Sequence, residues 1–144
     1  MRRARADGGS ILPLTACFGA LALVLVLLVT AATSLHLERK RLLTLADAAA
    51  LAGAESFELA DVELTEEGPR PVLQGDSVRD AVVDFVGRMP LDGFEELTVA
   101  EATTTDGRSA SVTLTSRWRP PVMTLFLPEG VAVEVTSVAR SVFG

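Results

Sequence analysis

A run of 27 residues without a charged side chain, from Ile11 to Leu37, constrains the fold of this chain more than any other feature. As an α-helix that rises about 1.5 Å per residue, it would be about 40 Å long, which exceeds the roughly 30 Å hydrocarbon core of a bilayer. The run therefore predicts one transmembrane helix over residues 11–37, tilted or with a protruding end. Residues 1–10 form a basic leader before it.

Three kinds of processing compete with a plain anchor. Val29-Thr30-Ala31 has the small residues of a signal-peptide cleavage site, but the apolar core before it is too long for such a peptide. The "LTAC" pattern that ends at Cys17 matches a lipobox, but its long apolar stretch follows the cysteine. The third is cleavage between Gly9 and Ser10, because "RADGGSILPL" resembles the leader of type IV prepilins, although Leu14 stands where such pilins usually carry glutamate. The alternative is an uncut, flexible Gly-Gly entry to the helix.

Charge and composition limit the functions that the rest of the chain can have. Residues 42–144 hold 17 Asp and Glu against 7 Arg, so the domain is acidic and we expect no nucleic-acid binding. Cys17 and His36 are the only cysteine and histidine, which excludes an internal disulfide and a CxxC metal site and leaves one base for a nucleophile. We therefore expect a protein that is not an enzyme and has no cofactor, no metal and no small-molecule substrate.

Paired carboxylates are the remaining route to catalysis. Glu95, Glu96 and Glu101 are candidates for glycoside cleavage, but nothing in the sequence places two of them across a cleft. We interpret them as solvated charges at the edge of a strand.

The stretch "ERKRLLTLADAAALAGAESF" indicates that the helix continues outside the membrane over residues 38–57, since it is rich in Ala and Leu and has no Gly or Pro between Leu42 and Ala52. A helix that is apolar on several sides is normally buried, and small residues let another backbone approach closely. Asp47 is then either a solvated aspartate or one half of a structural ion pair. The predicted helix-packing interface, against the chain's own domain or neighbouring copies, consists of Leu42, Leu45, Ala46, Asp47, Ala49, Ala50, Gly53 and Ala54.

These residues carry a family resemblance. "GGSILPL", the long apolar helix and "ERKRLLTLADAAALAGA" resemble the N-terminal segment of the TadE/TadG-like proteins of tight-adherence (Flp) pilus assembly. In that family a basic leader and a membrane helix run into a "rrrLqnaaDaAALAgA" pattern, and the resemblance covers about residues 8 to 57. It implies a single-pass protein of the bacterial cytoplasmic membrane with its C-terminal domain outside the cytoplasm. The charge pattern does not decide this orientation, because three Lys or Arg lie on each side of the span.

Residues 58–144 are expected to form a small α+β extracytoplasmic domain. Residues 59–74, with Pro69 and Pro71, predict a short edge strand or a loop. Asp76 or Ser77 is expected to cap a helix that runs to Met89. An i, i+4 ion pair between Asp84 and Arg88 supports this helix. An apolar stripe at helical spacing supports it too, and consists of Val78, Ala81, Val82, Phe85, Val86 and Met89.

A hairpin and a last strand complete the predicted fold. Asp106-Gly107 predicts a type I′ turn between the strands of "ELTVAEATTTDGRSASVTLTSRW". "GVAVEVTSVARSVF" alternates as a strand, and "VMTLFLP" with Phe126 is an apolar loop before it. The order of elements predicts helices on an antiparallel sheet, an α+β plan that is pilin-like in outline. The predicted pairs are Thr103 with Ala110, Glu101 with Val112, Val99 with Leu114 and Leu97 with Ser116, which leaves Thr98, Ser109, Ser111, Thr113 and Thr115 on a polar face.

Two functions are compatible with these features. The first is a non-catalytic structural or assembly component of a tight-adherence pilus, which contacts the membrane and other pilus-assembly or pilin subunits through its N-terminal helix and assembles into a surface filament if its leader is cut. The second is a membrane-anchored binding module of the cell envelope that uses the polar sheet face or the loop from Val122 to Pro128.

Overall fold

The computed structural model describes residues 11–56, 62–65, 68–120 and 128–140, and for residues 62–71 it describes the backbone alone. Its dominant element is helix α1, Ile11–Ala54, of 44 residues. The helix runs without a break from the apolar run into the stretch that follows it, as predicted, but ends at Ala54 instead of Phe57. Its end is closed by Ser56, whose backbone N–H and hydroxyl both donate to the carbonyl oxygen of Gly53, at 3.3 and 2.7 Å.

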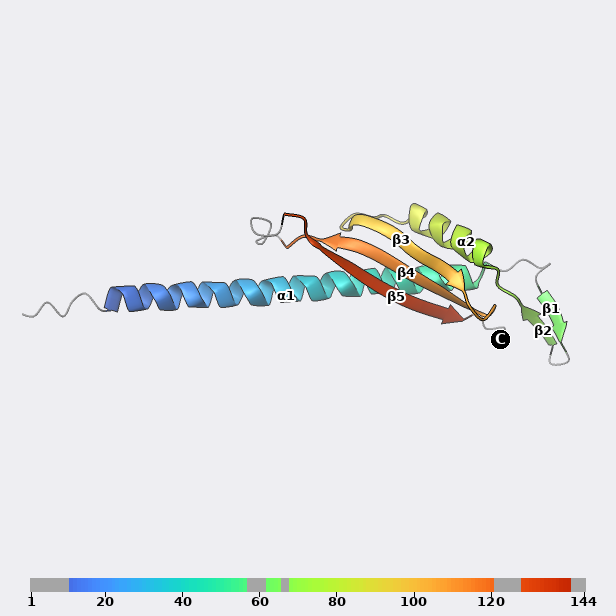
Figure 1. The fold of residues 1–144 in the computed structure, drawn as a ribbon, viewed down its shortest axis with the longest axis horizontal. Helices are drawn as coiled ribbons and strands as arrows, with labels where there is room; N and C mark the ends of the chain where they lie inside the picture. Colours follow the sequence, from blue (N-terminus) through green and yellow to red (C-terminus); the bar gives the residue numbers. More distant parts are fainter. Residues whose placement is uncertain (1–10, 57–61, 66–67, 121–127, 141–144) are drawn as a thin grey trace, which may run out of the picture.

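The domain has two layers. Strands β3 (Glu95–Thr104), β4 (Ser109–Trp118) and β5 (Val131–Arg140) form an antiparallel sheet in the order β3-β4-β5. The outer half of α1 lies along β4 and β5, and helix α2 (Gly75–Arg88) lies beside it over β3, as Figure 1 shows. The α+β prediction is confirmed. The core between the layers consists of Leu42, Ala46, Ala49, Ala50, Ala54, Leu73, Val78, Val82, Val86, Ala102, Ala110, Val112, Leu114, Val133 and Val135.

Helix α2 follows its predicted apolar stripe with small corrections. It begins at Gly75 after an N-cap residue at Gln74, so Asp76 lies in the first turn instead of at the cap, where its charge favours the helix dipole. Val78, Val82 and Val86 of the stripe are buried, and its other members are half-buried except for Met89, which is exposed. The predicted ion pair between Asp84 and Arg88 is present.

The proline-rich segment before α2 forms a separate two-stranded sheet. Strands β1 (Val62–Thr65) and β2 (Gly68–Pro71) pair antiparallel, and Pro69 and Pro71 both lie in β2. The prediction of one edge strand or a loop was therefore too simple. Both strands of this sheet are edge strands, so each has one side without a neighbouring strand. On that side there is no ladder hydrogen bond for the missing N–H of a proline to break.

The turn of the β3–β4 hairpin differs from the predicted one. Four residues, 105–108, connect the strands, and only Gly107 has a positive φ, of 66°. A type I′ turn needs two such residues. Here the Asp106 carboxylate accepts hydrogen bonds from the backbone N–H groups of Arg108 and Ser109, at 2.9 and 2.7 Å. These two bonds lower the pKa of Asp106 to about 2 from its usual 3.8.

The longer turn changes the register of the hairpin. Thr104 pairs with Ala110 and Ala102 with Val112, so the predicted pairs of Thr103 with Ala110 and Glu101 with Val112 were wrong. A bulge between Val99 and Glu101 then restores the predicted pair of Val99 with Leu114. This shift places Ala102 in the core and leaves the Glu101 side chain exposed. The predicted pairing would have placed Glu101 on the core face and Ala102 on the opposite face.

A second irregularity lies at the start of β3. The register shifts again between Glu95 and Thr98, so the predicted pair of Leu97 with Ser116 is absent from the ladder. Glu96 has a φ of 51°, and the buried Ser116 hydroxyl donates to the Glu95 carbonyl oxygen at 3.1 Å. The last strand, β5, forms as predicted and buries Val133 and Val135, whereas Val131 at its start is exposed.

Candidate functional site

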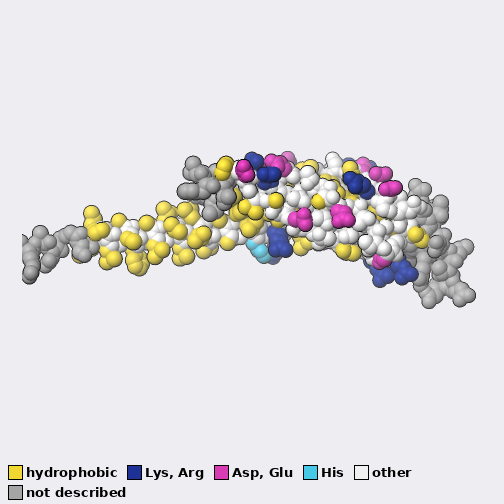
Figure 2. Space-filling model, viewed as in Figure 1, with side chains coloured by type: hydrophobic (Ala, Val, Ile, Leu, Met, Phe, Trp, Pro, Cys, Tyr) yellow, Lys and Arg dark blue, Asp and Glu magenta, His cyan; other side chains and the backbone are white. Residues whose placement is uncertain are grey.

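Helix α1 is the candidate site, and it divides into two parts that we call the free half, residues 11–30, and the docked half, residues 31–54. Side chains of the free half are exposed except for Leu27, which is half-buried. Figure 2 shows hydrophobic side chains around the free half, whereas charged side chains lie over the domain. The free half includes an 18-residue window that is long and apolar enough to cross a membrane and is not buried by the rest of the chain.

The docked half contains the predicted packing residues. The chain's own sheet and α2 cover six of them completely or nearly so, while Leu45 is half-buried and Asp47 is exposed. The structure thus brings these residues together against the domain. It shows no second chain, so their packing against neighbouring copies stays a prediction. The six are Leu42, Ala46, Ala49, Ala50, Gly53 and Ala54.

Gly53 marks the closest approach of α1 to the other two elements. A Cβ atom built on Gly53 would lie 3.1 Å from a methyl of Val78, 3.1 Å from a methyl of Val82 and 3.2 Å from the Cβ of Ala110. These three neighbours belong to α2 and β4, on two sides of the helix. The position therefore has room for a hydrogen atom and little more, as at other close helix contacts.

Asp47 has a partner that the sequence did not indicate. Its carboxylate accepts a hydrogen bond from the hydroxyl of Ser137 on β5, with 2.5 Å between the oxygens. Within the described part of the chain it has no ion pair, so the solvated aspartate describes it better than the structural ion pair. The bond ties the docked half to the edge strand of the sheet.

The other end of the docked half is held by a contact between residues 84 positions apart in the chain. The indole N–H of Trp118, the last residue of β4, donates to the hydroxyl of Ser34 at 3.2 Å. One turn further along α1, Glu38 is 9% exposed and makes no hydrogen bond or ion pair with a described residue. Sequence reasoning placed Ser34 within the membrane and missed both its contact with Trp118 and the burial of Glu38, since no local pattern links positions so far apart.

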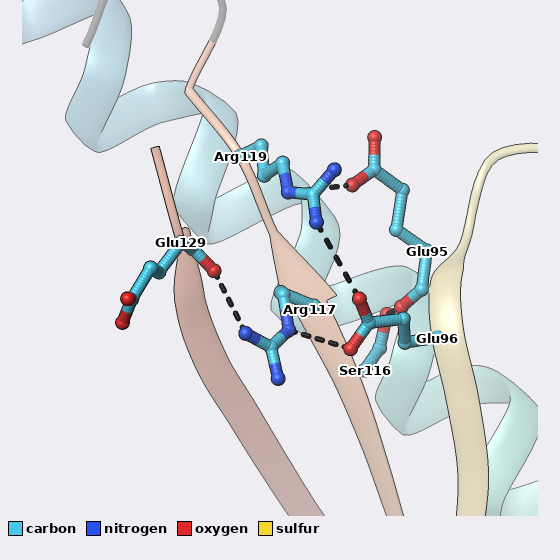
Figure 3. A network of polar contacts seen from close by, with 6 residues as sticks. All are labelled: Glu95, Glu96, Ser116, Arg117, Arg119 and Glu129. Carbon is cyan, nitrogen blue, oxygen red and sulfur yellow. Dashed lines mark hydrogen bonds and ion pairs between the residues drawn. The ribbon is translucent and has the colours of Figure 1, made fainter. Parts of the chain in front are cut away.

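The three glutamates considered for catalysis do not form a pair of free carboxylates. Arg119 Nε lies 3.2 Å from Glu95, and Arg119 Nη2 lies 3.4 Å from Glu96, as Figure 3 shows. Arg117 Nε lies 2.7 Å from Glu96 Oε2 but makes no hydrogen bond, so this contact is an ion pair without hydrogen-bond geometry. The Arg117 guanidinium also donates to the carbonyl oxygen of Glu129 at 2.9 Å. These contacts fix the start of β3 to the end of β4.

An open apolar groove lies beside the docked half, between α1, α2 and the start of β3. Its volume is about 380 Å³. Only one of its lining residues is charged, and Ala48 exposes its side chain there. Among the described residues no group of His, Cys, Asp and Glu could hold a metal ion. The groove is lined by Arg41, Thr44, Leu45, Ala48, Phe85, Met89 and Phe94.

Comparison with known proteins finds a family match for the N-terminal third of the chain. Residues 9–56 match a family model described as Flp pilus-assembly TadE/G-like. The resemblance to TadE/TadG-like proteins is confirmed over this segment. No curated protein and no solved structure matches the chain. The sheet and α2 lie outside the TadE/TadG-like segment, whose described residues contain α1 as their only helix or strand.

Some predictions lie beyond the described residues. The TadE/TadG-like segment begins at Gly9, but the predicted cleavage between Gly9 and Ser10 lies outside the described ranges, and so do residues 122–127 of the apolar loop. Both therefore stay predictions. So do the boundaries of the leader, the transmembrane helix and the extracytoplasmic domain.

Proposed function

We propose that this protein is a non-catalytic structural or assembly component of a tight-adherence (Flp-type) pilus, anchored in the cytoplasmic membrane by α1 with its C-terminal domain outside the cytoplasm. The match over residues 9–56 carries the proposal, because it covers the whole of α1. The free half supplies an apolar surface for lipid or for the helices of other pilus subunits. The docked half packs against the domain on the same helix.

The proposal assigns the partner contact to the free half, because the core already occupies the docked half. Gly19 offers a test, since a side chain added there would meet no other atom of the chain within 4 Å. In Gly19→Ile, the fold should remain intact while a close contact with another helix is blocked. Gly87 of α2 has equally free space, so Gly87→Ile is the matched control.

The experiment measures surface pili in the native host after deletion of the gene and complementation. We expect the deletion to abolish pili, wild type and Gly87→Ile to restore them, and Gly19→Ile to restore few or none. Normal pili in the deletion strain would refute a role in pilus assembly. Full restoration by Gly19→Ile would refute a partner contact at this position of the free half.

The mass of the mature N-terminus decides between the two forms of the proposal. A protein that starts at Ser10 has lost its leader and is free to enter a filament, whereas an intact protein is a permanent anchor and an assembly factor. The mass of the protein purified from native membranes distinguishes these two forms directly.

The groove beside α2 favours a second candidate, a membrane-anchored binding module of the cell envelope. It is apolar, open and formed by three elements, as small binding sites often are. Ala48→Trp would fill it without entering the core, since Ala48 is exposed. A binding module would lose its ligand in this variant, whereas a pilus component would keep its assembly function.

A further inference from the structure

The length of helix that the domain leaves uncovered matches the thickness of a bilayer. Counted from Ile11, where the described residues and the uncharged run both begin, the free half has 20 residues; at about 1.5 Å per residue these span about 30 Å, equal to a typical hydrocarbon core. Within the free half only Leu27 is half-buried. Burial increases directly afterwards, since Ala31, Ser34 and Leu35 are half-buried and Glu38 is almost fully buried. The domain therefore begins where the span has reached its required length.

Trp118 makes the polar contact with α1 that lies nearest to the free half. Tryptophan is a residue type that favours the membrane interface. Ser34 lies four residues beyond Thr30, which places its contact with Trp118 about 6 Å outside the hydrocarbon core. The headgroup layer extends roughly 5–7 Å on each side of that core. Tryptophan is enriched at this depth, because its ring is apolar and its N–H needs a partner.

The other groups at this end of the sheet suit the same environment. Val131, opposite Trp118 in the ladder, is 41% exposed. The nearby Arg117 and Arg119 are paired with glutamates, so the network brings little net charge to the interface (Figure 3).

We infer that the domain stands end-on upon the membrane, with the Trp118 end of the sheet in the phospholipid headgroup layer and the span ending near Thr30 instead of at Leu37. The partner of this surface is the phospholipid bilayer itself. The inference rests on the proposed function in one respect, that α1 spans the membrane. The opposite end of the sheet then stands about 30 Å away from the bilayer, since β3 has 10 residues at about 3.3 Å each.

Trp118 reports on its own depth, because it is the only tryptophan in the chain. The full-length protein is reconstituted into phosphatidylcholine vesicles that carry bromine either near the headgroup or near the end of the acyl chains, and tryptophan fluorescence is compared with unbrominated vesicles. We expect strong quenching by the shallow bromine and weaker quenching by the deep one. Cys17, in the free half, should resist a membrane-impermeant maleimide in the same vesicles.

A double variant provides the positional control. Trp118→Phe combined with Thr105→Trp moves the tryptophan to the exposed turn at the far end of the hairpin. We expect neither lipid to quench it. Equal quenching of the two proteins would mean that the domain lies flat on the bilayer and would overturn the end-on arrangement.

Two further outcomes separate this inference from the proposed function. Unquenched Trp118 with protected Cys17 would leave the anchor intact and overturn the seating of the domain, for example because a second copy covers this end. Labelled Cys17 would show that the free half is outside the bilayer, which overturns the anchor and the inference together.

Discussion

Replacement of Gly53 by alanine tests whether the docked half of α1 is packed as closely as the structure indicates. The new methyl would lie 3.1–3.2 Å from atoms of Val78, Val82 and Ala110, so no single neighbour can relieve the contact by moving. Overpacking of this kind costs about 1–3 kcal/mol. Alanine in place of glycine in a helix gains about 0.5–1 kcal/mol, so Gly53→Ala should destabilise the domain by up to about 2 kcal/mol.

Gly87→Ala isolates the packing contribution. Gly87 is the second-to-last residue of α2, as Gly53 is of α1, but an added methyl there would meet nothing within 4 Å. Gly87→Ala should therefore be stabilising by up to about 1 kcal/mol. Since the gain in helix propensity is common to both variants, their difference of about 1–3 kcal/mol measures the overpacking.

The assay is denaturant unfolding of the full chain in mild detergent, followed by the fluorescence of Trp118, with thermal unfolding as a second measurement. One kcal/mol corresponds to about 4–8 °C in the Tm of a domain of 60–100 residues. If Gly53→Ala raised stability as much as Gly87→Ala does, the close approach at Gly53 would be wrong.

Three further predictions concern polar contacts of the domain. Backbone N–H donors hold the pKa of Asp106 at about 2. The Asp106 carboxylate should therefore stabilise the turn above about pH 4 and lose this effect as the pH falls to about 2. A carboxyl NMR titration with a midpoint near 4 would contradict this. A double-mutant cycle of Ser34→Ala and Trp118→Phe should give a coupling of about 0.5–1.5 kcal/mol in denaturant unfolding, and additive effects would show that the hydrogen bond is absent. The same cycle for Glu96→Gln and Arg117→Gln should give at most about 1 kcal/mol, reduced by high salt, because the side chains are 54% and 39% exposed; a larger coupling that salt leaves unchanged would mean a buried pair.

The elements that the sequence predicts well are those with a local pattern. Helix α1 follows from an uncharged run and an Ala-rich continuation, and α2 from apolar residues at helical spacing. In the hairpin, the Val99–Leu114 pair was correct even though the turn was not, because the bulge absorbs the extra residue of the longer turn. Strong local periodicity thus predicts an element, whereas its register depends on details of the turn.

The features that could not be predicted from the sequence depend on contacts between distant residues. The hydrogen bond between Trp118 and Ser34 was not predicted, because nothing near Ser34 in the sequence indicates that Trp118 approaches it. The exposure of Asp47 depends on where β5 crosses the helix, which its apolar neighbours in the sequence do not reveal. The Ala-rich pattern predicted that the docked half is covered, but it left open whether the chain's own domain or neighbouring copies cover it.

The uninterrupted course of α1 has a mechanical consequence. Its 44 residues carry any tension from the free half straight into the domain, because the helix has no break between them. The strands β4 and β5 run alongside the docked half (Figure 1), so such a pull would load the whole contact in shear at once instead of peeling it residue by residue. The force needed to detach the domain would then grow with the length of the docked half, and shortening that half by one turn should weaken the attachment in a force measurement.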